Sequence, residues 1–224
     1  MKSQRTQAIV LRRTNYGEAD RIVQLLTPIG RRSVMARGVR REKSKLAGGI
    51  ELFAVSDVVI GQGRGELGVL TSARLVRFYR HIVEDYDRMQ FGYEMLKLVA
   101  RSSEMVDEPE WFDVALQVLA ALDASSVDLR LTQTWLYLHY ADLLGHALGL
   151  QYDIDGKRLV AESRYRYDVS EKGLKLAEGG EIGDRHIALL RLMSTKPLEK
   201  LALIGGIEEV IADCLLIARQ HAAT

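Results

Sequence analysis

The first 80 residues alternate short apolar runs with turn-forming residues. The runs are rich in Val, Ile and Leu, and each is short enough for a strand of a globular protein. Glycine, proline and asparagine separate them. The runs occupy residues 8–11, 22–26, 33–36, 53–60 and 67–71. This pattern predicts five strands in a small barrel or sandwich, and the OB-fold barrel is the common five-stranded nucleic-acid binder of this size.

The spacing of apolar residues becomes helical from about Tyr79 onwards. Apolar side chains then recur three and four positions apart, which is the repeat of an amphipathic helix. A long helix is expected from about Leu129 to a stop at Gly149, because glycine often follows a helix end. The other helical segments are 89–99, 114–122, 187–193 and 207–218.

Residues 151–169 interrupt the helical pattern. Asp153, Asp155 and Gly156 form a turn signature, and the alternation over residues 164–169 indicates a strand. We therefore expect a small β-hairpin inserted at about 151–169. The whole chain is predicted to be α+β, with an OB-fold nucleic-acid-binding domain at 1–80 and a helical domain at 81–224.

Charge divides the chain in the same place. The net charge of the 224 residues is +1, but residues 1–80 hold 16 Lys and Arg against 6 Asp and Glu, a net charge of +10. Residues 81–224 hold 15 against 24, a net charge of −9. A chain divided in this way typically presents its basic end to a polyanion. We expect the basic part to bind nucleic acid and the acidic part to bind proteins.

The basic residues are densest at positions 31–45, where seven Lys and Arg accompany one acid, Glu42. On one strand and the loop after it, such side chains would project several cations from a small area. Each could neutralise a phosphate and release a counterion. Arginine predominates, and its guanidinium makes forked contacts to phosphate and stacks on bases. The alternative is a solvated loop that only aids solubility, which the charge of the whole domain disfavours.

Two phosphate-binding motifs are incomplete. Residues 63–68 read Gly-x-Gly-x-x-Gly, but a strand is predicted after them where a dinucleotide site needs a helix. A hairpin turn is the favoured interpretation. Lys43-Ser44 follows Glu42, where a phosphate-binding loop needs glycine. Two aromatic residues of the basic domain, Phe53 and Tyr16, are candidates for stacking on a base, but packing in the core or in a turn is favoured for each.

Two apparent metal motifs are also weak. His139, Asp142 and His146 fall on one face of the predicted helix, but the sequence names no further strong ligand, so a polar helix edge is favoured. The Asp-x-Asp-Gly segment at 153–156 begins like a calcium loop, but Arg164 stands where that loop needs Glu. A turn is the favoured interpretation there.

The single cysteine, Cys214, excludes a disulfide framework and a cysteine-rich zinc site within one chain. It lies in an apolar helical run and is expected to be a buried packing residue. No signal peptide, membrane-spanning stretch or nucleophilic catalytic signature is found in the sequence. We expect a cytoplasmic protein that is not an enzyme and has no membrane partner.

Several stretches match, in order and spacing, the N-terminal signature of a known family. They are residues 8–13, 16–21, 26–28 with Gly30, 36–41 and 43–46. These stretches resemble the signature of the bacterial RecO recombination mediators over about residues 7–60. The rest of the chain resembles that family more in architecture than in motif.

The resemblance implies an OB-fold followed by a helical domain, and a role in DNA repair and recombination. It implies binding of single- and double-stranded DNA, annealing of complementary strands and partnership with RecR. It also implies contact with the C-terminal tail of single-strand binding protein, so that RecA can replace that protein on gapped DNA. The basic loop of the family maps onto Arg37, Arg40, Arg41, Lys43 and Lys45. The expected DNA-binding residues are these five with Arg12, Arg13, Arg31 and Arg32.

The inserted subdomain departs from the family pattern. Many members bind zinc there through four cysteines, and residues 150–180 of this chain contain none. We therefore expect no metal and no cofactor, with a small apolar cluster in place of the zinc. The cluster is expected to contain Tyr152, Ile154, Leu159, Tyr165 and Tyr167.

Two other functions are weighed against the mediator hypothesis. One is a protein-interaction adaptor whose basic face binds an acidic protein surface, which DNA titration at two salt concentrations would distinguish. The other is a nuclease, which needs clustered carboxylates to hold metal ions. The basic domain has six acidic residues with no obvious set among them, so the nuclease is disfavoured.

Overall fold

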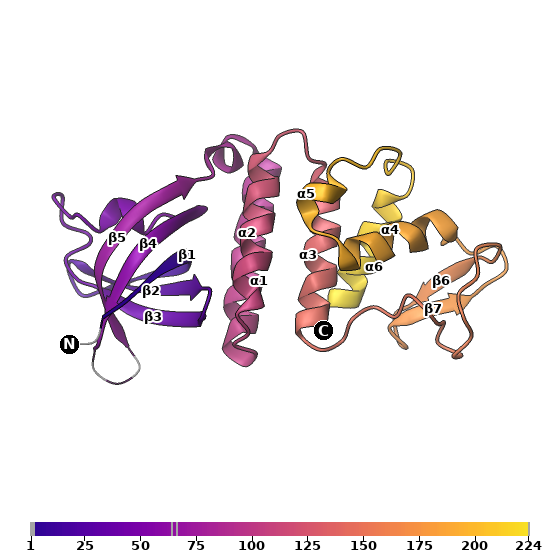
Figure 1. Cartoon of the computed structure of the whole chain (residues 1–224), viewed down its shortest axis with the longest axis horizontal. Coiled ribbons are helices and arrows are strands. Elements are labelled where there is room, and N and C mark those ends of the chain that lie inside the picture. The colour runs from indigo at the N-terminus through magenta and orange to yellow at the C-terminus, as the bar shows by residue number, and fades with distance from the viewer. Residues whose placement is uncertain (1–2, 64, 66, 224) are drawn as a thin grey trace. The chain divides into compact units, whose positions relative to one another are not determined.

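Figure 1 shows a computed structural model of the chain, which describes residues 3–63, 65 and 67–223. Contacts between residues divide it into two compact units, Met1–Ala124 and Ser125–Thr224. The first unit holds the predicted strands and two helices, and the second holds the remaining helices and a two-stranded hairpin. This division falls later than the boundary after residue 80 that the sequence suggested, because two helices pack with the strands.

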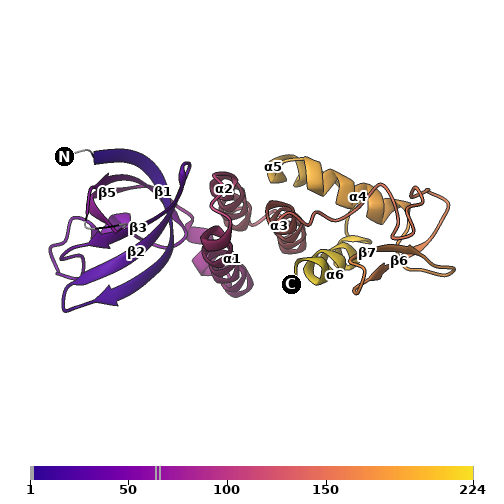
Figure 2. The same ribbon diagram turned by 90° about the horizontal axis from the view of Figure 1, so that it is seen from below.

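Five strands close into a barrel in the first unit (Figures 1 and 2). They are β1 (Ser3–Tyr16), β2 (Asp20–Thr27), β3 (Gly30–Ala36), β4 (Ala54–Gly61) and β5 (Gly68–Phe78). Their order around the barrel is β1-β2-β3-β5-β4, and β1 closes it by pairing with both β2 and β4. β3 and β5 pair in parallel, whereas the other pairs are antiparallel. The predicted five-stranded OB-fold is confirmed, and each strand overlaps one of the predicted runs.

The alternation of apolar and polar positions builds the interior of the barrel. In β2, Val23 and Leu25 are fully buried and Gln24 between them is partly exposed, because successive side chains of a strand point to opposite faces. A β-bulge between Val10 and Arg12 shifts the register of β1 against β2, and such bulges bend a strand. This bend lets one long strand pair with β4 through its first half and with β2 through its second.

Two helices, α1 (Tyr86–Met105) and α2 (Glu110–Asp123), complete the first unit after a 3₁₀ turn at Arg80–Glu84. In α1 the buried apolar residues recur at helical spacing, as predicted for residues 89–99. In α2 an apolar face carries the fully buried Trp111. Both helices contact strands of the barrel, which explains why they belong to the barrel's unit.

Phe53 joins α1 to the barrel from the residue just before β4. Its ring is 2% exposed and lies edge-on to the Tyr93 ring, with centroids 4.9 Å apart. The ring also fills the space beside Gly92, where an added Cβ would lie 2.8 Å from Phe53 Cε1. Phe53 is therefore a core residue, as predicted. Its φ of +54° is unusual for an aromatic residue, and the Tyr79 N–H holds its carbonyl at 3.0 Å.

The second unit packs three main helices beside a small hairpin (Figures 1 and 2). Its elements are α3 (Leu129–Leu143), β6 (Tyr165–Asp168), β7 (Gly173–Leu176), α4 (Asp184–Thr195), α5 (Leu198–Leu201) and α6 (Ile211–Ala222). Trp135 is buried in this core, and its indole N–H donates to the Lys196 carbonyl at 2.9 Å. Cys214 is fully buried, as predicted, and burial raises the pKa of its thiol to about 12. It is therefore an unreactive packing residue.

The helix α3 is shorter than the sequence suggested. It ends at Leu143 and not near Gly149, because Gly145 adopts a left-handed conformation with φ of +83°. His146 consequently lies beyond the helix, and the predicted alignment of His139, Asp142 and His146 on one helix face is wrong.

The hairpin also differs in position. Its first strand, β6, falls within the predicted strand at 164–169, but its partner β7 follows it and does not precede it. The expected turn is confirmed, since Asp153 Oδ1 accepts the N–H groups of Asp155 at 3.0 Å and Lys157 at 2.8 Å. Of the expected apolar cluster, Leu159 and Tyr165 are buried, but Tyr152 is 57% exposed and lies outside it.

A series of hydrogen bonds links the hairpin to α6 and to the segment after α3. The Tyr167 hydroxyl and His221 Nδ1 are 2.9 Å apart, and His221 Nε2 lies 2.7 Å from the His146 carbonyl. His221 is 3% exposed, and burial lowers the pKa of its imidazole. Burial likewise lowers the pKa of His139, whose Nε2 lies 3.1 Å from the Met193 carbonyl. The lowered pKa favours the neutral form of both rings in the folded unit.

The second unit is expected to lose stability as the pH falls below about 6.5, the ordinary pKa of histidine. A lowered pKa in the folded state means that the unfolded chain binds more protons there, so protonation favours unfolding. Urea unfolding of the full chain at about pH 7.5 and about pH 5.5 measures the difference, above the range in which carboxylates titrate. The double variant His139→Gln/His221→Gln should show a smaller difference. Equal pH dependence in the two proteins would contradict this assignment.

Candidate nucleic-acid interface

The loop after β3 is anchored to the turn between β1 and β2. We call residues 37–45 the basic loop. Gly38 has a left-handed φ of +62°, and its N–H donates to Asp20 Oδ1 at 2.7 Å. The Arg40 N–H donates to the Ala19 carbonyl at 2.9 Å, and Val39 between them is 2% exposed. The loop backbone is thus fixed at both a polar and an apolar point, while its charged side chains face solvent.

Most cations of the basic loop form no hydrogen bond or ion pair through their side chains within the described part of the chain. Arg37, Arg41, Lys43 and Lys45 are exposed, and their side chains have no hydrogen-bond or ion-pair partner among the described residues. Arg40 is also exposed and uses one guanidinium N–H, at 3.2 Å, on the Gly17 carbonyl. These charges stay fully solvated, so a phosphate can bind them without first breaking an internal ion pair.

Arg37 also lines a cavity beside the loop that joins β4 to β5. The cavity has a volume of about 450 Å³, and Met35, Leu67 and Val69 give it apolar walls. Oligonucleotides bind OB-folds on β2 and β3 and on the loops between β1 and β2 and between β4 and β5. Gly63 and Gly65 lie in this last connection between two antiparallel strands and Gly68 begins β5, which confirms the hairpin interpretation. Arg64 and Glu66 lie outside the described residues.

Arg31 and Arg32 lie at the other end of β3. A strand rises about 3.3 Å per residue, so Arg31 is about 20 Å from Arg37. Arg31 Nη1 forms an ion pair with Glu104 at 2.9 Å, and its backbone N–H donates to Asp107 at 2.7 Å. The Arg32 guanidinium donates to the carbonyls of Ile29 and Arg31. These two arginines are separate from the basic loop and already have partners.

Arg12 and Arg13 lie on β1, also outside the basic loop. Arg12 is exposed, and its side chain has no partner among the residues that the structure describes. Arg13 is half-buried, and its Nη1 contacts Glu51 Oε2 at 3.0 Å and the Ile50 carbonyl at 3.3 Å. The nine predicted cations are thus brought together only in part, with five of them on one anchored loop.

Other cations of the barrel surface were not singled out from the sequence. Arg5 and Arg74 flank Asp57 at 3.7 and 2.8 Å, and the hydrogen bond from Arg74 is the main reason that the pKa of this carboxyl is lowered. The Arg77 guanidinium lies 4.5 Å from the centre of the Tyr79 ring. The register between β1 and β4 brings Arg5 close to Asp57. This register cannot be predicted from the sequence of one strand alone.

The acidity of the helical part is not uniform. Residues 81–124 hold 3 Lys and Arg against 10 Asp and Glu, a net charge of −7, whereas residues 125–224 hold 12 against 14, a net charge of −2. The acidic segment therefore belongs to the barrel's unit. The negative charge expected of the helical domain is therefore concentrated in residues 81–124, which pack with the barrel, whereas residues 125–224 are close to neutral.

Among the described residues, no group of three or more His, Cys, Asp or Glu side chains is placed to hold a metal ion. A four-cysteine zinc site does not fit the hairpin region, because the chain has one cysteine and it lies in α6. The described helices include none that is long and apolar enough to cross a membrane.

Comparison with known families agrees with this architecture. The family model described as Recombination protein O N terminal matches residues 1–79, and the one described as Recombination protein O C terminal matches residues 83–222. The chain belongs to the recombination protein O family. The resemblance seen in the N-terminal signature is thereby confirmed, and both the N-terminal and the C-terminal family models match this chain.

Curated relatives of this family member carry the name DNA repair protein RecO. The one from Roseiflexus sp. (strain RS-1) is 41% identical over 143 residues, which are 63% of this chain and 50% of the relative. One from a Dehalococcoides mccartyi strain is 31% identical over 144 residues, 63% of this chain and 56% of the relative. One from Rubrobacter xylanophilus is 31% identical over 144 residues, 64% and 58% respectively. The chain therefore spans little more than half the length of these relatives.

Proposed function

We propose that this chain is a DNA repair protein that binds single-stranded DNA through the basic loop, without base-specific readout. The observation that carries the proposal is the anchored loop backbone beneath exposed, unpaired cations. A fixed backbone lowers the conformational entropy lost when the side chains meet phosphates. Arg12 is proposed to add to this contact, and Arg13, Arg31 and Arg32 to contribute less, because each of these three already has an internal partner.

The wider role proposed is that of a recombination mediator that is not itself an enzyme. On this proposal the chain also binds double-stranded DNA and anneals complementary strands. It acts with RecR and with the C-terminal tail of single-strand binding protein, and so helps RecA to load. The support is membership of the family and the names of the relatives. The physical basis for annealing is that cations of the loop screen the repulsion between two phosphate backbones.

Binding of a labelled single-stranded oligonucleotide by the full chain tests the proposal. Each phosphate neutralised on a single strand contributes about −0.7 to the slope of log affinity against log salt. Five loop cations should give a slope of roughly −3 to −4. A slope near zero would contradict phosphate binding and favour the protein-adaptor alternative. The strand should remain intact with Mg²⁺ present, and cleavage would instead indicate a nuclease.

Removal of the Asp20 carboxylate tests whether DNA affinity depends on the fixed conformation of the basic loop or only on its positive charge. Asp20→Ala deletes the acceptor of the Gly38 N–H and also removes a negative charge near the basic loop. If only charge mattered, DNA affinity would rise. We expect it to fall by about threefold, because loss of one hydrogen bond to a charged acceptor frees a loop that DNA must then order. Asp20→Asn is the matched control, since it removes the charge and keeps an acceptor, and it should not weaken binding.

A further inference from the structure

Tyr16, the last residue of β1, has an exposed side chain beside the basic loop. The residue is 55% exposed, and its side chain has no hydrogen bond or ring contact within the described part of the chain. The residues after it hold the loop, because the Arg40 guanidinium donates to the Gly17 carbonyl at 3.2 Å and the Arg40 backbone N–H donates to the Ala19 carbonyl at 2.9 Å. Tyr16 is thus the chain neighbour of a residue that contacts the basic loop.

The turn between β1 and β2 does not itself need a tyrosine at this position. Gly17 supplies the left-handed residue of the turn, with a φ of +56°. Tyr16 keeps the strand conformation and pairs with Asp20, whose carboxylate accepts the Gly38 N–H at 2.7 Å. Neither the backbone geometry of the turn nor a hydrogen bond therefore explains the aromatic ring.

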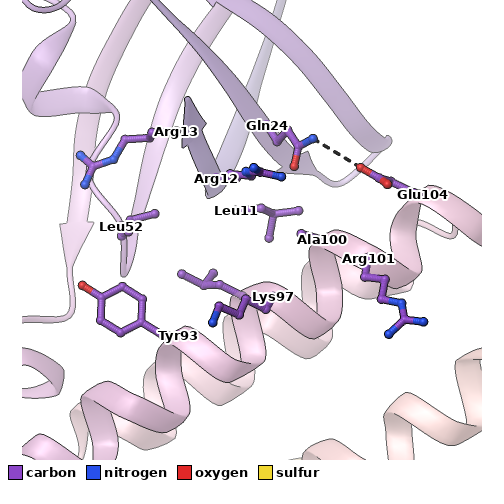
Figure 3. A pocket seen from close by; sticks show the side chains of 11 residues that line it. Leu11, Arg12, Arg13, Gln24, Leu52, Tyr93, Lys97, Ala100, Arg101 and Glu104 are labelled. Carbon is purple, nitrogen blue, oxygen red and sulfur yellow. Dashed lines mark hydrogen bonds between the residues drawn. The ribbon is translucent and has the colours of Figure 1, made fainter. Parts of the chain in front are cut away.

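The register of β1 places Tyr16 on the same face of the barrel as Arg12. Successive side chains of a strand project to opposite sides. Figure 3 shows Arg12 beside Gln24 of β2, its partner in the register, while Arg13 points away from both. Residues 12, 14 and 16 therefore project to one side of β1.

This face continues across β2 and β3 and reaches the basic loop. Thr14 pairs with Ile22 of β2, and Ile22 pairs with Met35 of β3. Residues directly opposite each other project to the same side of a sheet. Met35 lines the cavity of about 450 Å³ that Arg37 also lines. Tyr16 thus shares with the basic loop the β2 and β3 face on which OB-folds bind oligonucleotides.

The other three aromatic residues of segment 1–80 are buried or lie at the far end of β5. Phe53 and Tyr79 are buried. Phe78 is exposed but pairs with Ala54 at the end of β5, whereas β3 pairs with the beginning of that strand. Among the described residues of this segment, Tyr16 is therefore the aromatic side chain available to a ligand of the basic loop.

An aromatic ring at this place adds an interaction that the cations do not supply. Single strands and duplexes both carry phosphates, so phosphate contacts alone discriminate poorly between them. Stacking of an unpaired base on an aromatic side chain is worth about five- to hundredfold in affinity and tolerates any base. A base inside a duplex must first leave its own stack, which costs free energy. Glu18, exposed two residues after Tyr16, repels phosphate, so this turn suits an uncharged base.

We propose that Tyr16 stacks on one unpaired base of a strand held by the basic loop, and that this contact gives the site a preference for single strands over duplex DNA. The inference rests on the DNA binding proposed for that loop. Arg40, anchored to the Gly17 carbonyl, is placed to contact a phosphate next to the stacked base. When a complementary strand pairs with this base, the stacking contact is lost, so a duplex leaves the site more readily than a single strand.

The test compares Tyr16→Leu, which removes the ring, with Tyr16→Phe, which keeps it. Anisotropy follows binding of the full chain to a labelled mixed-sequence single strand, to a strand of the same length built from abasic residues, and to a duplex. Tyr16→Leu should weaken binding of the ordinary strand by about fivefold or more and leave the affinities for the abasic strand and the duplex within about twofold. Its salt slope should not change, because no phosphate contact is lost. Tyr16→Phe should bind all three ligands as the unchanged chain does.

Cross-linking gives a second measurement that does not depend on affinity. A single strand carrying 5-iodouracil is irradiated in complex with the full chain, and the adduct is located by mass spectrometry of tryptic peptides. The adduct should lie on peptide 14–21, which contains Tyr16 and is bounded by cleavage after Arg13 and Arg21. Adducts confined to other peptides would overturn the assignment.

The matched control is Tyr86→Leu, because Tyr86 is also an exposed tyrosine of the first unit but lies at the start of α1. It should leave all three affinities unchanged. Equal losses by Tyr16→Leu on the ordinary and the abasic strand would overturn the proposal, since the ring would then act on the loop and not on a base. So would an unchanged affinity of Tyr16→Leu for the ordinary strand while the salt slope of the unchanged chain is as expected. A slope near zero in the unchanged chain would instead contradict DNA binding by the basic loop itself.

Discussion

Neutralising four cations of the basic loop together is expected to weaken single-stranded DNA binding by about two orders of magnitude at low salt. The four are those without a partner among the described residues: Arg37, Arg41, Lys43 and Lys45, each replaced by glutamine. Each lost phosphate contact removes about 0.7 from the salt slope, so the slope should become shallower by almost 3. Anisotropy titrations of a labelled oligonucleotide at several salt concentrations measure both quantities.

The chain offers a matched control for this result at the start of β3. Arg37→Gln/Arg41→Gln removes two charges from the basic loop, and Arg31→Gln/Arg32→Gln removes two from the first residues of β3. The first pair should lower affinity by tenfold or more and the slope by about 1.4. The second should change affinity by less than about threefold, because its guanidinium groups already bind Glu104 and backbone carbonyls. Equal losses from both pairs would show that the DNA contact extends along the strand and is not centred on the loop.

This contrast illustrates what the sequence could and could not predict about the site. The density of positive charge located the loop correctly as an exposed basic segment, since exposed Lys and Arg need no partner in order to be stable. It could not separate Arg31 from Arg37, because their different environments depend on Glu104 and Asp107, more than 70 residues away in the chain. Partners at that distance are set by tertiary packing and leave no trace in local composition.

The fold could likewise be predicted where the signal was local and could not be where it depended on long-range packing. The five strands could be predicted because alternation of buried and exposed positions is a local signal, as at Val23, Gln24 and Leu25. The unit boundary could not, since it depends on α1 packing against the barrel through Phe53. The early end of α3 was missed because Gly149 and Gly145 are equally plausible stops in sequence, and only the left-handed φ of Gly145 decides between them.

Gly92→Val is expected to lower the free energy of unfolding of the first unit by about 3 kcal/mol, a large part of the 5–15 kcal/mol typical of a domain. Even a Cβ at this glycine would lie 2.8 Å from Phe53 Cε1 and 3.4 Å from Ile82 Cγ2. Valine adds two further methyl groups where there is no room. Urea unfolding measures the loss, and hydrogen exchange followed by mass spectrometry assigns it to the first or the second unit.

Gly92→Ala gives the sharper test, because two effects oppose each other. Replacing glycine by alanine inside a helix ordinarily stabilises by about 1 kcal/mol. Overpacking against a buried ring costs about 1–3 kcal/mol, so net destabilisation is expected. The double variant Gly92→Ala/Phe53→Leu should then lose less than the sum of the single variants, by at least about 0.5 kcal/mol, because leucine vacates the space that the ring edge fills. Stabilisation by Gly92→Ala alone would contradict this expectation. It would mean that the Phe53 ring can move aside, and that the packing between α1 and the barrel accommodates an added methyl group.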